Sequence, residues 1–442
     1  MHYESELSQR EPTKLTELPV ELLERLGQYL SPKDLLQSVP AAHPYLNNVF
    51  SDQYWRSRVR RNFPEAPPDD VPRPFRTCLA SGRSKTSERS SWKQYGAHLE
   101  WRHRQFARNH LTSTSNSLSN AAATFTALSF ADQGNLVLYA LANDKGRIHV
   151  TTTASLGKDE WSDAVNSQHV MHKHQRTCTQ IQSSWSRISS AGSWDSRIAI
   201  YDLQPFQLQY LLETGSQVDA HAFMDQHHIV VKTRDGTISL FDVRASLQSP
   251  VQHIPAFQRD CTFICSLLCD DRTVITGGDE RDFNWLKRID LRTNHVVANA
   301  QVCKFEPNFN TQDGSALHLS EGVLWVGGLT SDAVAYSPST LEVLHDFGPS
   351  FGLPVKKSRR VCGLHYNERQ LLLVKNNSCT MLDIWKKPKV IWKHAPEIYC
   401  SHMDFDYKRS MMLVCGYDFK NPGPNGEPAA VMKLLKPDEN FT

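Results

Sequence analysis

One repeated pattern, which begins at residue 124, constrains the fold of this 442-residue chain more than any other feature. Each copy has a short strand, a second strand of small and apolar residues, a polar turn, and a third strand with alternating β-branched residues. The two clearest copies are Ile188–Leu203 and Ile229–Val243. In these copies a turn acid, Asp195 or Asp235, stands seven residues before a strand-ending acid. Because the alternation buries one face of each hairpin, the pattern predicts repeated antiparallel sheets.

Five weaker copies follow the same plan, so the total is seven. They comprise residues 136–150, 273–291, 323–337, 370–385 and 411–435. The turn-to-turn spacing of about 40 to 50 residues is the range expected of propeller blades. Separate hairpins would leave exposed strand edges, and a closed ring removes that problem. The sequence therefore predicts an all-β, seven-bladed β-propeller over residues 109–442.

The last copy sets a condition on closing the ring. It needs an outer strand, yet the chain ends soon after Leu435. We predict that residues between Phe106 and Ala121 supply that strand. The alternative is that the seventh copy is incomplete and that six blades close instead.

The region before the repeats has a helical pattern. After Leu18-Pro19, apolar residues recur on one face of a helix of about three turns, at Leu22, Leu23, Leu26, Tyr29 and Leu30. Ser31-Pro32-Lys33-Asp34 is typical of a new helix start. The helix that follows it carries Leu35, Leu36 and Val39.

A third helix start, at Ser51-Asp52, leads into a segment with an apolar face and a basic face. Tyr54, Trp55 and Val59 form the apolar face. We interpret the basic residues as a solvated face; they are Arg56, Arg58, Arg60 and Arg61. Helices this short bury little surface by themselves, so we expect part of their apolar area to contact a partner or the next domain.

Residues 14–63 resemble an F-box, because they contain a Leu-Pro opening, a helix ending in Tyr-Leu-Ser, an Asp-Leu-Leu segment and a late tryptophan. The resemblance implies a small all-α module whose residues pack the module or face a Skp-type adaptor. The implied adaptor-docking set is Leu18, Pro19, Leu22, Leu23, Leu30, Leu35, Leu36 and Trp55. Pro40 and Pro44 depart from the family's third helix and leave its start open. A plain helical cap on the next domain would show the same leucine periodicity.

The segment between the two regions has two parts. Residues 64–91 are rich in proline, serine and charge, so we predict a linker. Residues 92–108 have a helical spacing that begins at Trp92. This tryptophan-led segment resembles the connecting helix of F-box/WD-repeat proteins, which implies that it orients the module.

The repeats themselves resemble WD-repeat blades. The positions that match the family's Trp-Asp signature are Tyr201-Asp202 and Phe241-Asp242, and Lys173-His174 occupies the place of its Gly-His pair. In that family the residue before the turn acid points toward the central rim. The resemblance therefore implies a client-binding rim that contains Asn143, Trp194 and Arg234.

Bulk properties exclude several partners. The formal net charge of +2 and the pI near 8.0 are too mild for broad capture of nucleic acid or anionic lipid. No uncharged apolar run approaches the ~20 residues that span a bilayer. Ten cysteines are scattered singly, which favours reduced thiols. We expect a cytoplasmic protein, and the pattern leaves a nuclear share open.

The sequence nominates no catalytic residue, metal site or cofactor. We interpret four histidines as surface or turn residues without acidic partners, namely His172, His174, His227 and His228. Cys261, Cys265 and Cys269 fall on one face of a predicted strand and indicate core thiols. Gly277-Gly278 and Gly327-Gly328 lack the helix and the lysine of a phosphate loop. No Ser/His/Asp set stands out.

The combination of the two resemblances predicts a non-catalytic substrate receptor of a Skp/cullin/F-box ubiquitin ligase. The helical module would bind a Skp-type adaptor and, through it, a cullin scaffold, while the propeller would bind a client protein. The alternative is a non-degradative WD-repeat scaffold in another assembly. A propeller enzyme or RNA binder would need a carboxylate or basic-aromatic constellation, and the sequence shows neither.

Overall fold

The computed structural model describes most of the two predicted regions. The described residues are 18–30, 34–62, 92, 96, 100, 111–117, 124–142, 146–156, 170–172, 174, 177–184, 186–192, 195–244, 249–257, 267–270, 272–280, 283–304, 317–320, 322–327, 333–346, 361–367, 370–375, 378–384, 389–406, 411–422 and 428–437. They fall into two compact units, a helical unit before residue 111 and a propeller unit from residue 111 to 437. The predicted linker, 64–91, lies outside the described residues.

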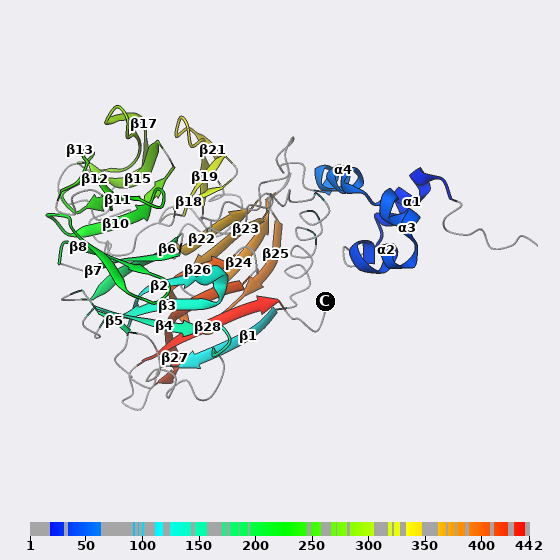
Figure 1. The fold of residues 1–442 in the computed structure, drawn as a ribbon, viewed down its shortest axis with the longest axis horizontal. Coiled ribbons are helices and arrows are strands. Elements are labelled where there is room, and N and C mark those ends of the chain that lie inside the picture. The colour runs from blue at the N-terminus through cyan, green and yellow to red at the C-terminus, as the bar shows by residue number, and fades with distance from the viewer. Residues whose placement is uncertain are drawn as a thin grey trace, which may run out of the picture. The chain divides into compact units, whose positions relative to one another are not determined.

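Within residues 18–62, the described part of the helical unit contains four short α-helices and one π-helical turn; the α-helices are labelled in Figure 1. They are α1 (Val20–Gly27), the π-helical turn (Asp34–Ser38), α2 (Val39–Ala42), α3 (Pro44–Val49) and α4 (Asp52–Asn62). The prediction of about three turns for the first helix was too long, because α1 has eight residues. It ends at Gly27, a residue with poor helix propensity, which packs directly against the rings of Phe50 and Tyr54.

The two prolines that left the third helix open now have defined places. Pro40 lies within α2, and Pro44 is the first residue of α3, where a missing backbone N–H costs nothing. His43 Nδ1 accepts a hydrogen bond from the Tyr45 N–H at 3.2 Å and caps α3. The chain therefore starts a new helix at Pro44 instead of continuing α2.

The helices enclose one hydrophobic core. Its buried members are Leu23, Leu35, Leu46, Val49, Phe50, Tyr54, Trp55, Val59 and Trp92. Trp92, Gly96 and Glu100 are helical, and the other residues of the predicted connecting helix lie outside the described part of the chain. A Cβ at Gly96 would stand 2.6 Å from Val59 and 2.8 Å from Trp55, so this segment packs tightly on α4.

The propeller unit consists of seven antiparallel four-stranded sheets, as predicted. Blade 1 has β2 (Phe125–Ala131), β3 (Leu136–Leu141), β4 (Arg147–Thr152) and β5 (Val170–His172). Blade 2 has β6 (Cys178–Ser184), β7 (Arg187–Gly192), β8 (Arg197–Asp202) and β9 (Leu208–Glu213). Blade 3 has β10 (Val218–Phe223), β11 (His228–Thr233), β12 (Thr237–Asp242) and β13 (Gln252–Pro255). Blade 4 has β14 (Leu267–Cys269), β15 (Thr273–Glu280), β16 (Phe283–Asp290) and β17 (His295–Lys304).

The remaining blades follow the same order. Blade 5 has β18 (Leu317–Ser320), β19 (Val323–Val326), β20 (Val334–Tyr336) and β21 (Val343–Asp346). Blade 6 has β22 (Val361–Asn367), β23 (Gln370–Lys375), β24 (Ser378–Asp383) and β25 (Lys389–His394). Blade 7 has β26 (Tyr399–Asp406), β27 (Met411–Pro422), β28 (Pro428–Pro437) and β1 (Leu111–Ser117).

Strand β1 closes the ring, as predicted from the missing outer strand. It pairs with β28 from Leu111↔Pro437 to Ser117↔Val431, and the two strands lie side by side in Figure 1. The inner strands of blades 7 and 1 also contact each other. There Asp404 Oδ2 accepts a hydrogen bond from the Phe130 N–H at 2.6 Å. The six-bladed alternative was therefore wrong.

The cores of the ring lie between neighbouring blades. Tyr201 is buried among residues of blades 1 and 2, and Phe241 among residues of blades 2 and 3. These two aromatics are the positions matched to the Trp-Asp signature. Each aromatic ring packs on residues of two neighbouring sheets and so helps to hold the two blades together.

Candidate docking surfaces

A strip of large apolar side chains on α1 faces solvent. Its members are Leu22 and Leu26, which lie one turn apart on the same face, and Tyr29 follows just after the helix. Val20 is also exposed, but it lies on the opposite side of α1. Leu22 and Leu26 keep 44% and 45% of their surface exposed, although the core of the unit is formed. Neighbouring apolar side chains that stay exposed on so small a unit mark an interaction surface.

The predicted adaptor-docking residues differ in how far they are buried. Leu23, Leu35 and Trp55 are almost completely buried, so they hold the unit together and do not face solvent. Leu18 and Leu30 are half-buried and pack against that core. Pro19 and Leu22 are exposed, and the side chain of Leu36 lies outside the described part. Leu26 extends the exposed group, and the helical period had already placed it on the same face as Leu22.

Arg58 corrects the interpretation of the basic face of α4. It is only 3% exposed, and its Nε and Nη2 donate to Glu100 Oε1 and Oε2 at 2.5 and 2.6 Å. Its Nη1 also donates to the Gly27 carbonyl oxygen and to the Tyr54 hydroxyl. Arg58 therefore joins α1, α4 and the connecting segment, because one guanidinium satisfies acceptors from all three. Arg60 and Arg61 remain solvated as predicted.

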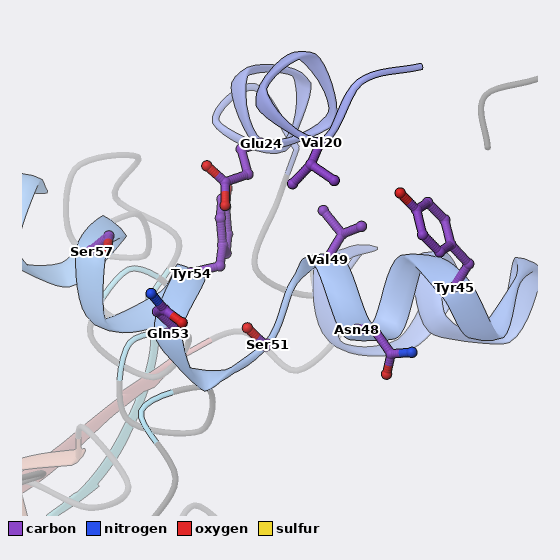
Figure 2. Close-up of a pocket in the computed structure, with 9 residues that line it drawn as sticks. All are labelled: Val20, Glu24, Tyr45, Asn48, Val49, Ser51, Gln53, Tyr54 and Ser57. Carbon is purple, nitrogen blue, oxygen red and sulfur yellow. The ribbon is translucent and has the colours of Figure 1, made fainter. Parts of the chain in front are cut away.

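A pocket of about 470 Å³ opens on the helical unit between α1, α3 and the start of α4 (Figure 2). Val20 and Glu24 reach into it from α1, while Tyr45 and Val49 point toward them from α3. The other lining residues are Asn48, Ser51, Gln53, Tyr54 and Ser57. The pocket lies on the side of α1 that carries Val20 and Glu24, whereas Leu22 and Leu26 lie on the opposite side of the helix.

The predicted client-binding rim is described at one of its three residues. Arg234, in the turn between β11 and β12, donates from Nη1 to Gln217 Oε1 at 3.0 Å. Asn143 and Trp194 lie outside the described residues. The following acid, Asp235, accepts hydrogen bonds from Thr233 Oγ1 and the Thr237 N–H, so it builds the turn itself.

The same face of the ring carries an aromatic cluster that the sequence analysis missed. Phe419 packs edge-on against Tyr399 with ring centroids 6.0 Å apart and lies 6.2 Å from Tyr417. Phe419 is 63% exposed. It lies beyond the part of β27 that pairs with β26 and before the connection to β28, at the end that corresponds to the Arg234 turn in blade 3. Exposed tyrosine and phenylalanine at a rim are typical anchors of protein interfaces.

His174 corrects the interpretation of the histidines as surface residues. It is 1% exposed, and its Nδ1 and Nε2 lie 2.8 Å from Asp195 Oδ2 and from Ser190 Oγ. Ser190, His174 and Asp195 are connected in the order of a catalytic nucleophile, base and acid, a set that the sequence did not predict. Ser190 has no exposed surface, so its hydroxyl is closed to a substrate. The arrangement instead links the turn at Asp195 to β7.

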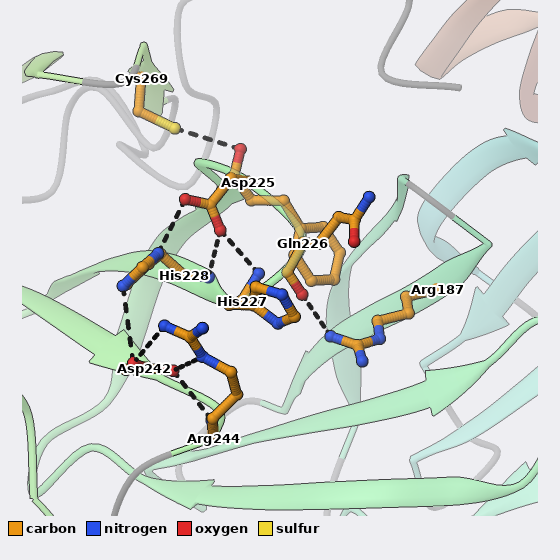
Figure 3. A network of polar contacts seen from close by, with 9 residues as sticks. Arg187, Asp225, Gln226, His227, His228, Asp242, Arg244 and Cys269 are labelled. Carbon is orange, nitrogen blue, oxygen red and sulfur yellow. Dashed lines mark hydrogen bonds and ion pairs between the residues drawn. The ribbon is translucent and has the colours of Figure 1, made fainter. Parts of the chain in front are cut away.

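His228 also has the acidic partners that the sequence analysis did not expect (Figure 3). Its Nδ1 lies 2.7 Å from Asp225 Oδ2, and its Nε2 lies 3.7 Å from Asp242 Oδ2. Hydrogen bonds from Arg244 lower the pKa of Asp242 to about 2. Asp225 Oδ1 accepts from the N–H groups of His227 and His228, so the network fixes the turn between β10 and β11.

Among the described residues, the remaining candidate cysteines and glycines form no metal-binding or phosphate-binding site. Cys269 is half-buried and donates to the Phe223 carbonyl oxygen, whereas Cys261 and Cys265 lie outside those ranges. Gly278 lies in β15 against the ring of Phe257. No group of three or more His, Cys, Asp and Glu residues in the described ranges is arranged to hold a metal ion. No described helix is long and apolar enough to cross a membrane.

Comparison with one solved structure supports the fold. A chain in the crystal structure of a mitotic checkpoint complex matches 74% of this chain and 93% of its own length, with a TM-score of 0.52 and 12% identity. The computationally designed Ika8 protein matches 71% of this chain and 98% of its own, with a TM-score of 0.48 and 17% identity. No family model and no curated protein matches the chain. Identity this low shows the fold alone.

Proposed function

We propose that this chain is the substrate-recognition subunit of a Skp/cullin/F-box ubiquitin ligase, in which the helical unit binds a Skp-type adaptor and the propeller binds a client protein. The exposed apolar strip on α1 carries the proposal. It lies within the stretch that resembles an F-box, and it stays exposed although the unit has a core of its own. The chain would act in the cytoplasm, without a catalytic residue, and the adaptor would link it to a cullin scaffold.

The size of the helical unit supports a docking role. Small units bury a low fraction of their surface, and they often depend on a partner for further burial. Leu22 and Leu26 stand one helical turn apart on α1, so a single partner surface can cover both. Burial of each leucine would contribute about 1 kcal/mol or more to the association.

The propeller supports the second half of the proposal. Its closed ring holds Arg234 and the Tyr399, Tyr417 and Phe419 cluster on one face, and propeller folds generally bind protein partners on such faces. Rigid elements place side chains for recognition more accurately than free loops do. We therefore add the aromatic cluster to the sequence-predicted rim of Asn143, Trp194 and Arg234 as candidate client contacts.

Adaptor binding tests the proposal. We expect the full-length chain to co-purify with a Skp-type adaptor, and Leu22→Asp with Leu26→Asp to abolish this association. Both sites are exposed, so the variant should keep its fold, whereas a charge at fully buried Leu35 would unfold the unit.

Val251→Asp with Val390→Asp is the matched control, because these propeller valines are exposed to a similar degree. Unchanged adaptor binding by the α1 variant contradicts the docking assignment. Adaptor binding without any change in client half-life after depletion of the chain favours the non-degradative scaffold.

A further inference from the structure

Every N–H donor of the Arg58 guanidinium has an acceptor, and two of the acceptors are backbone carbonyl oxygens at and just after the end of α1. Nη1 donates to the Gly27 carbonyl oxygen at 2.5 Å, and Nη2 donates to the Leu30 carbonyl oxygen at 3.3 Å. Nε and Nη2 donate to the two carboxylate oxygens of Glu100, and Nη1 also donates to the Tyr54 hydroxyl. These contacts use all the donors that a guanidinium has. Arg58 therefore caps the C-terminal end of α1, where a cation also interacts favourably with the helix dipole.

Glu100 reaches Arg58 because the connecting segment packs on α4. Trp92, Gly96 and Glu100 are helical and stand one turn apart in sequence, so they lie on one side of the segment. Trp92 belongs to the core of the unit, and a side chain at Gly96 would collide with Trp55. One turn later, the same side of the segment brings Glu100 to Arg58. The two carboxylate oxygens bind the guanidinium as a fork, which fixes its plane and aims the remaining donors at α1.

The turn that Arg58 holds carries part of the exposed strip. Leu26 lies immediately before Gly27, and the Leu26 carbonyl oxygen accepts the N–H of Tyr29 at 3.0 Å. Tyr29 is 87% exposed. Because α1 ends at Gly27, which has no side chain to restrict its backbone, the direction of Leu26 and Tyr29 depends on what holds the carbonyl groups around them.

We propose that Glu100 is a positioning residue for adaptor docking: it aligns Arg58, and Arg58 holds the turn that presents Leu26 and Tyr29. The inference rests on the proposed function, because it takes the strip on α1 as the surface that a Skp-type adaptor covers. The docking module then includes the connecting segment and extends beyond residues 14–63, which resemble an F-box.

The test measures the affinity of full-length variants for a purified Skp-type adaptor, together with hydrogen exchange in the helical unit. Arg58→Met with Glu100→Leu removes both charges and keeps most of the buried volume, so α4 should stay protected. The carbonyl groups of Gly27 and Leu30 lose their donor, and we expect the amides of residues 28–30 to exchange faster. The dissociation constant for the adaptor should rise about tenfold, because part of the docking surface is no longer held in its binding conformation.

Arg61→Met is the matched control, since Arg61 also lies on α4 but is exposed. Its affinity should equal that of the wild-type chain. If the double variant keeps α4 protected and binds as tightly as the wild-type chain, the positioning role is wrong and the proposed docking on α1 stands. If the wild-type chain does not bind the adaptor, both proposals fail.

Arg58→Lys keeps the test decisive if the double variant loses its fold. A lysine retains the charge opposite Glu100, but its ammonium has fewer donors and no planar fork, so it cannot hold the carbonyl groups of α1 in the same way. We expect weaker adaptor binding while α4 stays protected from exchange. Wild-type affinity in this variant would overturn the positioning role.

Discussion

The helical unit and the propeller bury polar groups in different ways. The helical unit encloses one full ion pair, Arg58 with Glu100, in the middle of a single core. The propeller encloses several separate polar networks, such as His174 with Ser190 and Asp195 in blade 2 and the ion pair of Lys287 with Glu280 in blade 4, and it repeats the blade arrangement seven times. A small unit that depends on one buried ion pair loses a large part of its free energy of unfolding when one member of the pair is removed. In the ring, several similar interfaces between blades each contribute to stability, so the loss of one polar contact removes a smaller part of the free energy of unfolding.

The largest expected effect is therefore in the helical unit. Arg58→Ala should destabilise it by about 3 to 5 kcal/mol, because Glu100 is left charged and buried without a partner. That amount is comparable to the whole stability of a small unit. Hydrogen exchange should show loss of protection in α1 and α4, while the strands of the propeller keep theirs.

Replacing both members of the pair sharpens the comparison. Arg58→Met with Glu100→Leu removes the charges together and keeps most of the volume, so it should recover most of the lost protection. If the double variant is as unstable as Arg58→Ala, the damage comes from lost packing and not from the orphaned carboxylate.

The sequence predicted features that repeat or that lie close together along the chain. The seven blades followed from their hairpin pattern, and the closing strand β1 followed from the missing strand of the last copy. The apolar face of α4 followed from its helical period. Each of these features depends on local alternation, which the order of residues shows directly.

Features that join distant residues could not be predicted. Arg58 had the spacing of a solvated face, and its partner Glu100 lies 42 positions away in sequence. His174 looked like a surface residue because its partners reach it only after the chain has folded back through β7. Periodicity reports which side of an element is apolar, but it does not report which distant acid covers a given cation or imidazole.

The second largest effect should be a pH dependence of the propeller. Burial and the nearby His174 lower the pKa of His221 to about 4, although a hydrogen bond with the Ser189 backbone opposes the shift. In the unfolded chain its pKa is about 6.5. Between these values the unfolded state binds a proton that the folded state excludes. The contribution of neutral His221 to the free energy of unfolding is therefore fully present above pH 6.5. It falls by up to about 3 kcal/mol as the pH approaches 4.

Urea unfolding of the wild-type chain and of His221→Gln at pH 7, 5.5 and 4.5 isolates this contribution. The variant should lose less stability than the wild-type chain over the same interval, since other titrating groups are common to both. Equal losses in the two proteins would show that His221 is not responsible. In the helical unit, hydrogen exchange over the same interval should be independent of the substitution.

The smallest effect on stability is expected for substitutions at the exposed surfaces. There, substitutions in the two units should each affect the binding of a different protein. Tyr399→Ala with Phe419→Ala removes side chains that are 43% and 63% exposed, so the stability should change less than at the buried sites, by about 0.5 to 1 kcal/mol per site. We expect this variant to keep adaptor binding and to lose client proteins in proximity labelling.

Leu22→Asp with Leu26→Asp should leave the proteins labelled around the propeller unchanged and should lose the adaptor. Trp194→Ala with Arg234→Ala tests the sequence-predicted rim in the same assay. If only that variant alters the labelled set, the client binds the predicted rim and the aromatic cluster is a solvent-exposed feature of blade 7.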